Sequence, residues 1–201
     1  MSSNLKENNN TPSNRSLFIF LDRDGTINED YGYVTSPDKV TLIPDAANAI
    51  AKFKELGATV IIVSNQSAIS RGMATEYDVE ITNQELIKQL LNENPNALID
   101  LILWSPDGPD DLSSTRKPEI GMFLHAKKEL MINPENCWII GDKISDIEFG
   151  INAGFPENQC LLVLTGQGEE NKIKLFKKYP STICFKNLLQ ASMYISKSIT
   201  S

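Results

Sequence analysis

The sequence is poor in the side chains that most often bind transition metals. Its 201 residues include one histidine, His125, and three cysteines, none of them in a Cys-x-x-Cys pair. Each cysteine lies at or beside an apolar run, so buried, reduced thiols are expected rather than disulfides or metal ligands. A Ser-His-Asp triad, a phosphohistidine intermediate and a zinc site built on histidine are all disfavoured. Any chemistry must use carboxylates, lysine, arginine and hydroxyls.

Positive charge and long apolar segments are also scarce. The chain has 19 basic and 26 acidic residues, a formal net charge of −7, so a general nucleic-acid groove is not expected. No run approaches the roughly 18 apolar residues of a membrane-spanning helix. The polar residues 1–16 are interpreted as a disordered tail, not a signal peptide or anchor, and residues 17–201 as a single domain. These features predict a cytoplasmic protein with no membrane partner.

Short, solid apolar runs recur along the chain. They occupy residues 17–21, 59–64, 99–104, 137–141 and 160–164, with a weaker run at 182–185. Solid runs are typical of strands that are buried on both faces of a parallel sheet. Between them, apolar residues at three- and four-residue spacing predict helices near residues 45–57, 75–93, 119–130 and 145–153. The alternation predicts an α/β fold, a Rossmann-like parallel sheet with helices on both faces.

Polar residues with chemical capability follow four of the predicted strands. They are Asp22 and Asp24 after the first, Ser64 after the second, Lys117 after the third and its loop, and Asp142 after the fourth. Ligands of such sheets bind at the carboxyl ends of the strands. The sequence therefore predicts a site at this edge, which disfavours the alternative that the segment FIFLDRDGTIN (18–28) merely leaves the core through a polar turn.

The residue types at this edge favour phosphoryl transfer. Asp22 and Asp24 are two residues apart, so an extended segment points both to the same side, where one can attack and the other can transfer a proton. Asp142 adds a third carboxylate, and three acids require a cation, for which Mg²⁺ suits an all-oxygen shell. Ser64, Lys117 and nearby amides would surround a tetrahedral anion, which favours a route through an aspartyl phosphate. Neither a P-loop nor a Gly-x-Gly-x-x-Gly motif is present.

Five segments together resemble the haloacid dehalogenase superfamily of phosphatases. They are FLDRDGTIN, DYGYV, SNQSAISRG, RKPEIGM and GDKISD, within residues 17–166. The resemblance is strongest to the D,D-heptose 1,7-bisphosphate 7-phosphatases and the related histidinol-phosphate phosphatases. It implies a Mg²⁺-dependent phosphatase that acts on a phosphorylated sugar or another small phosphorylated metabolite. A histidinol-phosphate phosphatase, a nucleic-acid 3′-phosphatase and a non-catalytic binding module on the same fold are the alternatives.

The resemblance also implies roles for single residues. Asp22 would be the nucleophile and Asp24 the general acid and base, while Ser64 and Lys117 would hold the phosphoryl group. The carboxylates of Asp22 and Asp142 and the main-chain oxygen of Asp24 would bind Mg²⁺. The residues that match the family's substrate-recognition positions are Asp30, Gly32, Tyr33, Asn65, Arg116 and Lys143. Arg23, Gln66 and Ser67 are also predicted to bind substrate. Asp146 is expected at a helix start, as a capping or supporting residue.

The loop at 104–118 departs from the family pattern. Many relatives carry Cys-x-His and Cys-x-Cys there and bind a structural zinc ion. The corresponding residues here are Ser105, Asp107, Ser113 and Thr115. Oxygen ligands of this kind do not make a structural zinc site, so no zinc is expected, and prolines and side-chain hydrogen bonds should order the loop. About 40 residues separate Asp24 from Ser64, which predicts a minimal cap and a fairly open site. A monomer is expected.

Overall fold

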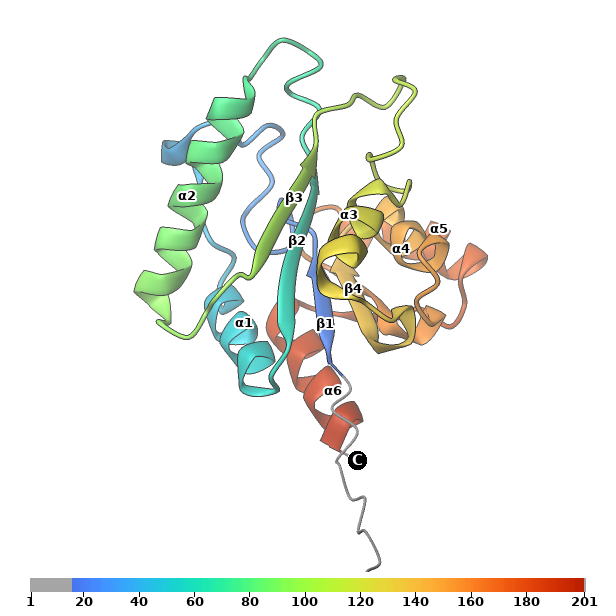
Figure 1. Ribbon diagram of the computed structural model, residues 1–201. Helices are drawn as coiled ribbons and strands as arrows, with labels where there is room; N and C mark the ends of the chain where they lie inside the picture. The colour runs from blue at the N-terminus through green and yellow to red at the C-terminus, as the bar shows by residue number, and fades with distance from the viewer. Residues whose placement is uncertain (1–15, 201) are drawn as a thin grey trace, which may run out of the picture.

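The computed structural model describes residues 16–200 and is an alternation of strands and helices (Figure 1). The predicted tail, apart from Ser16, lies outside the described residues. The elements are β1 (Phe18–Leu21), η1 (Pro37–Lys39), α1 (Ala46–Glu55), β2 (Thr59–Asn65), α2 (Glu76–Glu93), β3 (Leu101–Ser105), α3 (Gly121–Leu130), η2 (Pro134–Asn136), β4 (Cys137–Gly141), α4 (Ile144–Asn152), η3 (Glu157–Gln159), β5 (Cys160–Val163), α5 (Gly168–Lys178), β6 (Ile183–Phe185) and α6 (Leu188–Thr200).

The strands form one parallel sheet in the order β3-β2-β1-β4-β5-β6. β1 lies near the centre, and Phe20 is in register with Ile61 of β2 on one side and Ile139 of β4 on the other. From β1 the chain builds outward first through β2 and β3, and then in the opposite direction from β4. The switch point between β1 and β4 opens a crevice at the carboxyl ends of these strands. The predicted fold class is confirmed.

Helices cover both faces of the sheet (Figure 1). α1, α2 and α6 belong to one hydrophobic core, and α3, α4 and α5 to the other. Because side chains alternate along a strand, β1 supplies both cores, with Ile19 and Leu21 on the first side and Phe18 and Phe20 on the second. The ring of Phe20 lies 5.3 Å from that of Phe155. Burying an aromatic or aliphatic side chain of this size contributes about 1.5–3 kcal/mol, so β1 is held from both sides.

Two helices, α5 and α6, were not predicted from the sequence. α6 packs along α1 through Leu188, Ala191 and Ile195. In α5 only Gly168 and Leu175 are buried, so the helix shows little of the apolar periodicity that identifies helices. In both segments small or polar residues stand at buried positions, which weakens the signal.

Three connecting segments rise above the carboxyl ends of the strands. They are residues 22–45, which include η1, residues 66–75 and residues 106–120. Within the described part of the chain, none of them forms a separate cap domain. In the same part of the chain, no helix has the length and apolar character needed to cross a membrane.

Candidate active site

Three buried carboxylates meet at the switch point of the sheet. Asp22 directly follows β1, Asp142 directly follows β4, and Asp146 lies in the first turn of α4. An oxygen from each lies within 4.8 Å of an oxygen from the others. A Cβ atom on either Gly25 or Gly166 would collide with Asp142 Oδ2, so these two positions admit only glycine while the carboxylate stays in place. The main chain therefore closes tightly around this acidic group.

Lys117 places a buried ammonium beside these acids. Its Nζ donates to Asp22 Oδ1 at 2.6 Å and to the Val63 carbonyl at 2.6 Å, and it pairs with Asp146 Oδ1 at 2.7 Å. Burial alone would lower the pKa of Lys117, but the carboxylates of Asp146 and Asp22 outweigh it and raise the pKa above the ordinary value. Lys117 is therefore a permanent positive charge in the site.

Asn65 fixes the position of Lys117 through the main chain. The Lys117 amide donates to Asn65 Oδ1 at 2.9 Å, and Asn65 Nδ2 donates to the Lys117 carbonyl at 3.0 Å. This two-way pairing joins the end of β2 to the segment before α3. Asn65, predicted to contact substrate, thus uses its amide group to orient Lys117, although it also borders the pocket described below.

The acidic group fits a hard divalent cation. Asp22 Oδ2 and Asp142 Oδ1 are buried and have no hydrogen-bond partner among residues 16–200. Burial and the nearby Asp22 raise the pKa of Asp142 to about 8, because two buried anions at this distance repel. Mg²⁺ prefers carboxylate oxygens and would satisfy both unpaired atoms.

Asp146 performs the capping role expected from the sequence. Its Oδ2 accepts a hydrogen bond from the Lys143 amide at 2.9 Å, at the N-terminus of α4, while Oδ1 faces Lys117. The capped end of α4 fixes the short segment from Asp142 to Asp146, and it thereby fixes the position of the Asp142 carboxylate.

Asp24 has a different environment from the other acids. Each of its carboxylate oxygens accepts two hydrogen bonds, Oδ1 from Arg23 Nε (3.1 Å) and Asn28 Nδ2 (2.9 Å), and Oδ2 from Arg23 Nη2 (2.9 Å) and Gln66 Nε2 (2.9 Å). Gln66 Nε2 also lies 2.8 Å from Ser64 Oγ, so it connects Asp24 to the end of β2. Four donor atoms therefore hold the Asp24 carboxylate in place beside the buried acids Asp22, Asp142 and Asp146.

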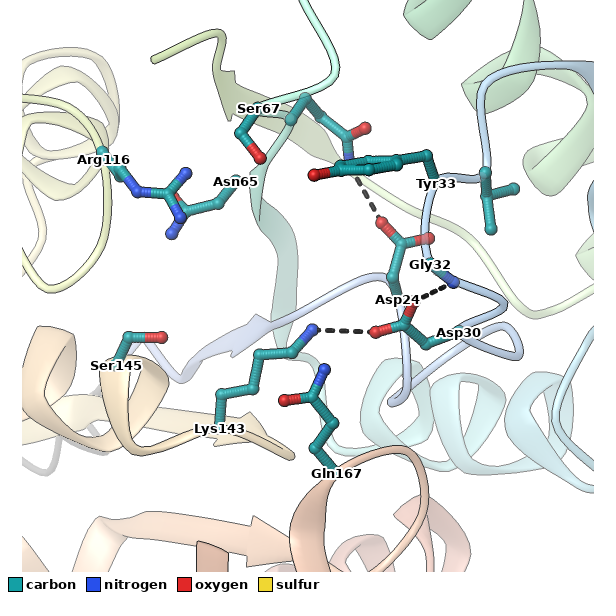
Figure 2. Close-up of a pocket in the computed structure, with 12 residues that line it drawn as sticks. Asp24, Asp30, Gly32, Tyr33, Asn65, Ser67, Arg116, Lys143, Ser145 and Gln167 are labelled. Carbon is teal, nitrogen blue, oxygen red and sulfur yellow. Dashed lines mark hydrogen bonds and ion pairs between the residues drawn. The ribbon is translucent and has the colours of Figure 1, made fainter. Parts of the chain in front are cut away.

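A pocket of about 320 Å³ adjoins the buried acids (Figure 2). Eight of the nine predicted substrate-binding residues line it: Asp30, Gly32, Tyr33, Asn65, Gln66, Ser67, Arg116 and Lys143. A smaller cavity of about 30 Å³ lies against the predicted catalytic residues Asp22, Asp24, Ser64 and Lys117. The arrangement offers a narrow space next to Asp22 and a wider, polar space beyond it.

Opposite walls of the wider pocket carry different charges. Lys143 Nζ donates to Asp30 Oδ2 at 3.1 Å, so the charges of Lys143 and Asp30 neutralise each other on one wall (Figure 2). The main-chain N–H of Gly32 donates to the other oxygen, Asp30 Oδ1, at 2.9 Å. Arg116 lies across the pocket, and its Nη1 donates to the Asp107 carbonyl at 2.8 Å. Burial and the neighbouring Arg71 lower the pKa of Arg116. In the described structure Arg116 has no carboxylate within ion-pair distance.

The Arg23 side chain does not line this pocket, although Arg23 was predicted to bind substrate. Its side chain is about 1% exposed and donates to Asp24, to Asn83 Oδ1 and to the Val34 carbonyl within the protein. Conversely, Ser145 and Gln167 line the pocket and were not predicted. The main-chain N–H of Gln167 donates to Asp142 Oδ2 at 2.8 Å. Gln167 could have been predicted from its position shortly after β5, because residues that follow the strands of a parallel sheet lie at the edge where ligands bind.

A carboxylate orders the loop between β3 and α3. Asp107 Oδ2 accepts hydrogen bonds from the hydroxyls of Ser113 (2.6 Å), Ser105 (3.2 Å) and Thr115 (3.2 Å). The Ser113 hydrogen bond keeps the pKa of Asp107 below its ordinary value, against the opposing effect of burial. The Arg116 amide donates to Ser113 Oγ at 2.8 Å. Ser105, Asp107, Ser113 and Thr115, the four residues at which no zinc site was expected from the sequence, thus form one hydrogen-bonded group that also holds Arg116.

Fold and site together define an α/β protein with a buried acidic centre at the switch point of its sheet and a polar pocket beside it. The family model of the haloacid dehalogenase-like hydrolases matches residues 3–154, and the chain belongs to this family. A D-glycero-β-D-manno-heptose-1,7-bisphosphate 7-phosphatase of Haemophilus influenzae is 37% identical over 160 residues, which are 75% of this chain and 86% of the relative. A D-glycero-D-manno-heptose-1,7-bisphosphate 7-phosphatase of Chlorobaculum tepidum is 34% identical over 178 residues, 82% of this chain and 87% of the relative.

A solved structure of a similar protein supports the same assignment. The D,D-heptose 1,7-bisphosphate phosphatase from B. bronchiseptica, complexed with magnesium and phosphate, superposes with a TM-score of 0.82. The two chains are 27% identical, and the match covers 90% of this chain and 99% of the other. The similarity extends over nearly the whole sheet and its helices.

We expect that Asp107→Ala loosens the loop at 104–118 without unfolding the protein. Three hydroxyls lose their common acceptor, and hydrogen bonds to a charged group contribute about 1.5–3 kcal/mol each in favourable geometry. Hydrogen exchange at the Thr115 and Arg116 amides, which both donate to Ser113 Oγ, should accelerate about tenfold or more. Asp110→Ala, at an exposed position of the same loop, is the matched control. Unchanged exchange in Asp107→Ala would contradict the role assigned to this carboxylate.

Proposed function

We propose that this protein is a Mg²⁺-dependent phosphatase that removes the 7-phosphate of D-glycero-D-manno-heptose 1,7-bisphosphate through an aspartyl phosphate on Asp22. One observation carries the proposal. Asp22 is buried, Lys117 holds its Oδ1 at 2.6 Å, and its Oδ2 is without a hydrogen-bond partner in the described structure. Lys117 fixes this carboxylate in a position from which it can attack phosphorus, and the unpaired Oδ2 remains available to the cation, so Asp22 is positioned as a nucleophile. The names of the relatives support the substrate.

The first chemical step transfers the phosphoryl group to the enzyme. An oxygen of Asp22 attacks phosphorus, and the bond from phosphorus to the sugar oxygen breaks. Asp24 enters this step as the carboxylic acid, with the Gln66 side chain no longer donating to its protonated Oδ2, and gives its proton to the departing sugar oxygen. Lys117 and Ser64, which border the small cavity with Asp22, bind the phosphoryl oxygens while charge is redistributed. The products are the sugar alcohol, an aspartyl phosphate and the Asp24 carboxylate.

The second step releases phosphate and restores the enzyme. The Asp24 carboxylate takes a proton from a water molecule, whose oxygen attacks phosphorus. The bond between phosphorus and Asp22 breaks, which leaves Asp22 as a carboxylate and Asp24 as the acid. The sum of both steps is hydrolysis of one phosphomonoester. Asp24 borders both the small cavity and the wide pocket, where water and the leaving sugar oxygen would meet it.

Mg²⁺ would be held by the carboxylates of Asp22 and Asp142 and by the main-chain oxygen of Asp24. When bound, the ion neutralises charge so that an anionic nucleophile can approach a phosphate dianion. The need is clear from the charges alone. Lys117 is shared by Asp22 and Asp146, and Lys143 by Asp30 and, at 4.0 Å, Asp142, so the two ammonium groups do not balance the four carboxylates.

The pocket favours a bisphosphate over histidinol phosphate. Arg116 lacks a carboxylate partner among residues 16–200, so it can bind a second anionic group at the far end of the substrate. Histidinol phosphate would present a cationic amine there instead. Asp30, Tyr33, Ser67 and Lys143 offer hydrogen bonds to sugar hydroxyls along the wall of the pocket. We further propose a cytoplasmic, monomeric, single-domain enzyme that acts on small metabolites, in line with the net charge of −7.

Asp22→Asn is expected to abolish turnover, because an amide cannot form the acyl phosphate. Asp24→Asn should lower the rate by about 10²–10⁴-fold by removing the proton donor. Both are measured as phosphate release by protein whose circular dichroism matches the wild type. Asp38→Asn, at an exposed position on η1, is the control and should retain full activity. Substantial turnover by Asp22→Asn would exclude the proposed intermediate.

EDTA should remove activity and Mg²⁺ should restore it, since the carboxylate cluster needs a cation before it accepts a phosphate. Mg²⁺ should also raise the Tm of the wild-type protein, because a ligand that binds only the folded state stabilises it, and Asp142→Asn should lose this response.

Elemental analysis of protein purified without chelator should find no stoichiometric zinc. Full activity in metal-stripped buffer, or one zinc per chain, would contradict these assignments.

At a fixed Mg²⁺ concentration, kcat/KM should be higher for heptose 1,7-bisphosphate than for histidinol phosphate. Arg116→Ala should lower kcat/KM for the bisphosphate by about 10–100-fold, the loss expected for a hydrogen-bonded charge pair. Heptose 7-phosphate, which lacks the second phosphate, is the matched control substrate and should be far less affected. Equal losses on both sugars would show that Arg116 does not recognise the second phosphate, and preference for histidinol phosphate would overturn the substrate.

A further inference from the structure

Arg23 lies at the centre of a buried polar network that reaches from the active site to α2. Its Nε and Nη2 donate to the two oxygens of Asp24, and its Nη1 donates to Asn83 Oδ1 at 2.9 Å. Nη2 also donates to the Val34 carbonyl at 3.1 Å. The guanidinium therefore binds the Asp24 carboxylate, the Asn83 side chain and the Val34 carbonyl at the same time.

Asn83 is a polar residue on the buried face of an otherwise amphipathic helix. It lies between Val79 and Leu86, which are buried on the same helix, and it is itself about 7% exposed. An unpaired buried amide would cost stability, so its contact with Arg23 is the interaction that accounts for it. α2 is well anchored, because Thr75 and Asp78 form a reciprocal capping box at its start. Asn83 is thus a fixed point to which Arg23 is attached.

The geometry points to Asn83 and Arg23 as positioning residues that hold the Asp24 carboxylate in place for proton transfer. This inference rests on the proposed function, in which Asp24 is the acid and base. Two parallel hydrogen bonds from one planar guanidinium fix both the position and the plane of a carboxylate. Asn83 in turn fixes the guanidinium, since loss of the Oδ1 acceptor leaves a buried N–H without a partner and favours a shift of Arg23.

Stability alone does not account for this network. Replacing buried ion pairs by apolar side chains of similar size is often neutral or stabilising, so an arginine in this position is not needed to fill space. The network instead meets the requirement of proton transfer, in which a misplacement of about 1 Å can cost about 100-fold in rate. Val34 borders the pocket, and its carbonyl is bound by the same guanidinium, so the pocket wall and the acid share one anchor.

The leaving group distinguishes a positioning role from a purely structural one. Expulsion of 4-nitrophenolate requires little help from an acid, whereas expulsion of the more basic phenolate requires more. The ratio of kcat/KM for 4-nitrophenyl phosphate to that for phenyl phosphate therefore measures how well Asp24 delivers its proton. Because kcat/KM reports the steps up to and including the first irreversible one, here transfer of the phosphoryl group to Asp22, the later hydrolysis of the aspartyl phosphate does not affect the ratio. The two probes have similar size and avoid any dependence on sugar recognition.

Asn83→Leu should raise this ratio by about tenfold, a part of the 10²–10⁴-fold that a general acid contributes. Arg23→Lys keeps the charge but loses the planar fork, and should raise the ratio in the same direction. Asn83→Asp retains an acceptor oxygen and should restore the ratio toward the wild-type value. Thr82→Val is the matched control, because Thr82 is buried next to Asn83 on α2 and its hydroxyl donates to the Asp78 carbonyl, not to Arg23. It should leave the ratio unchanged.

The outcomes separate this inference from the function on which it rests. A wild-type ratio that Asp24→Asn does not change means that Asp24 is not the acid, which overturns the proposed role and the inference together. A ratio that changes in Asp24→Asn but in neither Asn83→Leu nor Arg23→Lys overturns the inference alone. Equal losses on both phosphates in the two variants would show a general structural defect and would also overturn it. If Asn83→Leu does not fold, as judged by circular dichroism, Arg23→Lys decides the question.

Discussion

The burial of the Lys117 ammonium is the interaction on which the site depends. It joins Asp22 after β1, the Val63 carbonyl of β2 and Asp146 of α4, three elements that are distant in the sequence. A buried charge is tolerated only with close partners of opposite charge, and removal of one partner from such a pair typically costs about 3–5 kcal/mol. The lysine and the carboxylates therefore depend on each other. Lys117 needs the acids to remain charged, and the acids need Lys117 to remain close together.

The four acids of the site are divided by their surroundings into different tasks. Asp22 has one oxygen held by Lys117 and one unpaired, whereas Asp24 has both oxygens bound by donors. Asp146 caps α4 and faces Lys117, and Asp142 lies against two glycines that leave room for its carboxylate. The same side-chain chemistry thus gives a nucleophile, a proton carrier, a support and a cation ligand in the function proposed here. Position within the network, not residue type, separates these roles.

Much of the fold and the centre of the site could be predicted because their signals are local. Solid apolar runs indicated the strands, and polar residues directly after them indicated the site. The position of the Arg23 side chain away from the pocket follows from the same periodicity: if Asp22 and Asp24 point to one side, the residue between them points to the other. Asn83 could not be found, since its partner Arg23 is 60 residues away and no spacing rule connects them. The hydroxyl groups around Asp107 were expected only as unspecified hydrogen bonds, because a loop's partners depend on its final path.

The central place of β1 has a consequence for how this protein can change. β1 is paired on both sides and supplies both hydrophobic cores, so the segment that carries Asp22 belongs to the part of the structure that opens least often by local unfolding. Much of the wall of the wide pocket comes from connecting segments above the sheet, including residues 28–34 and the loop that carries Arg116. Such segments tolerate substitution and changes of length far better than central strands do. New substrates are thus accessible by altering those segments while the reactive centre stays constant, so one architecture can give rise to a series of enzymes that differ in selectivity and share one chemistry.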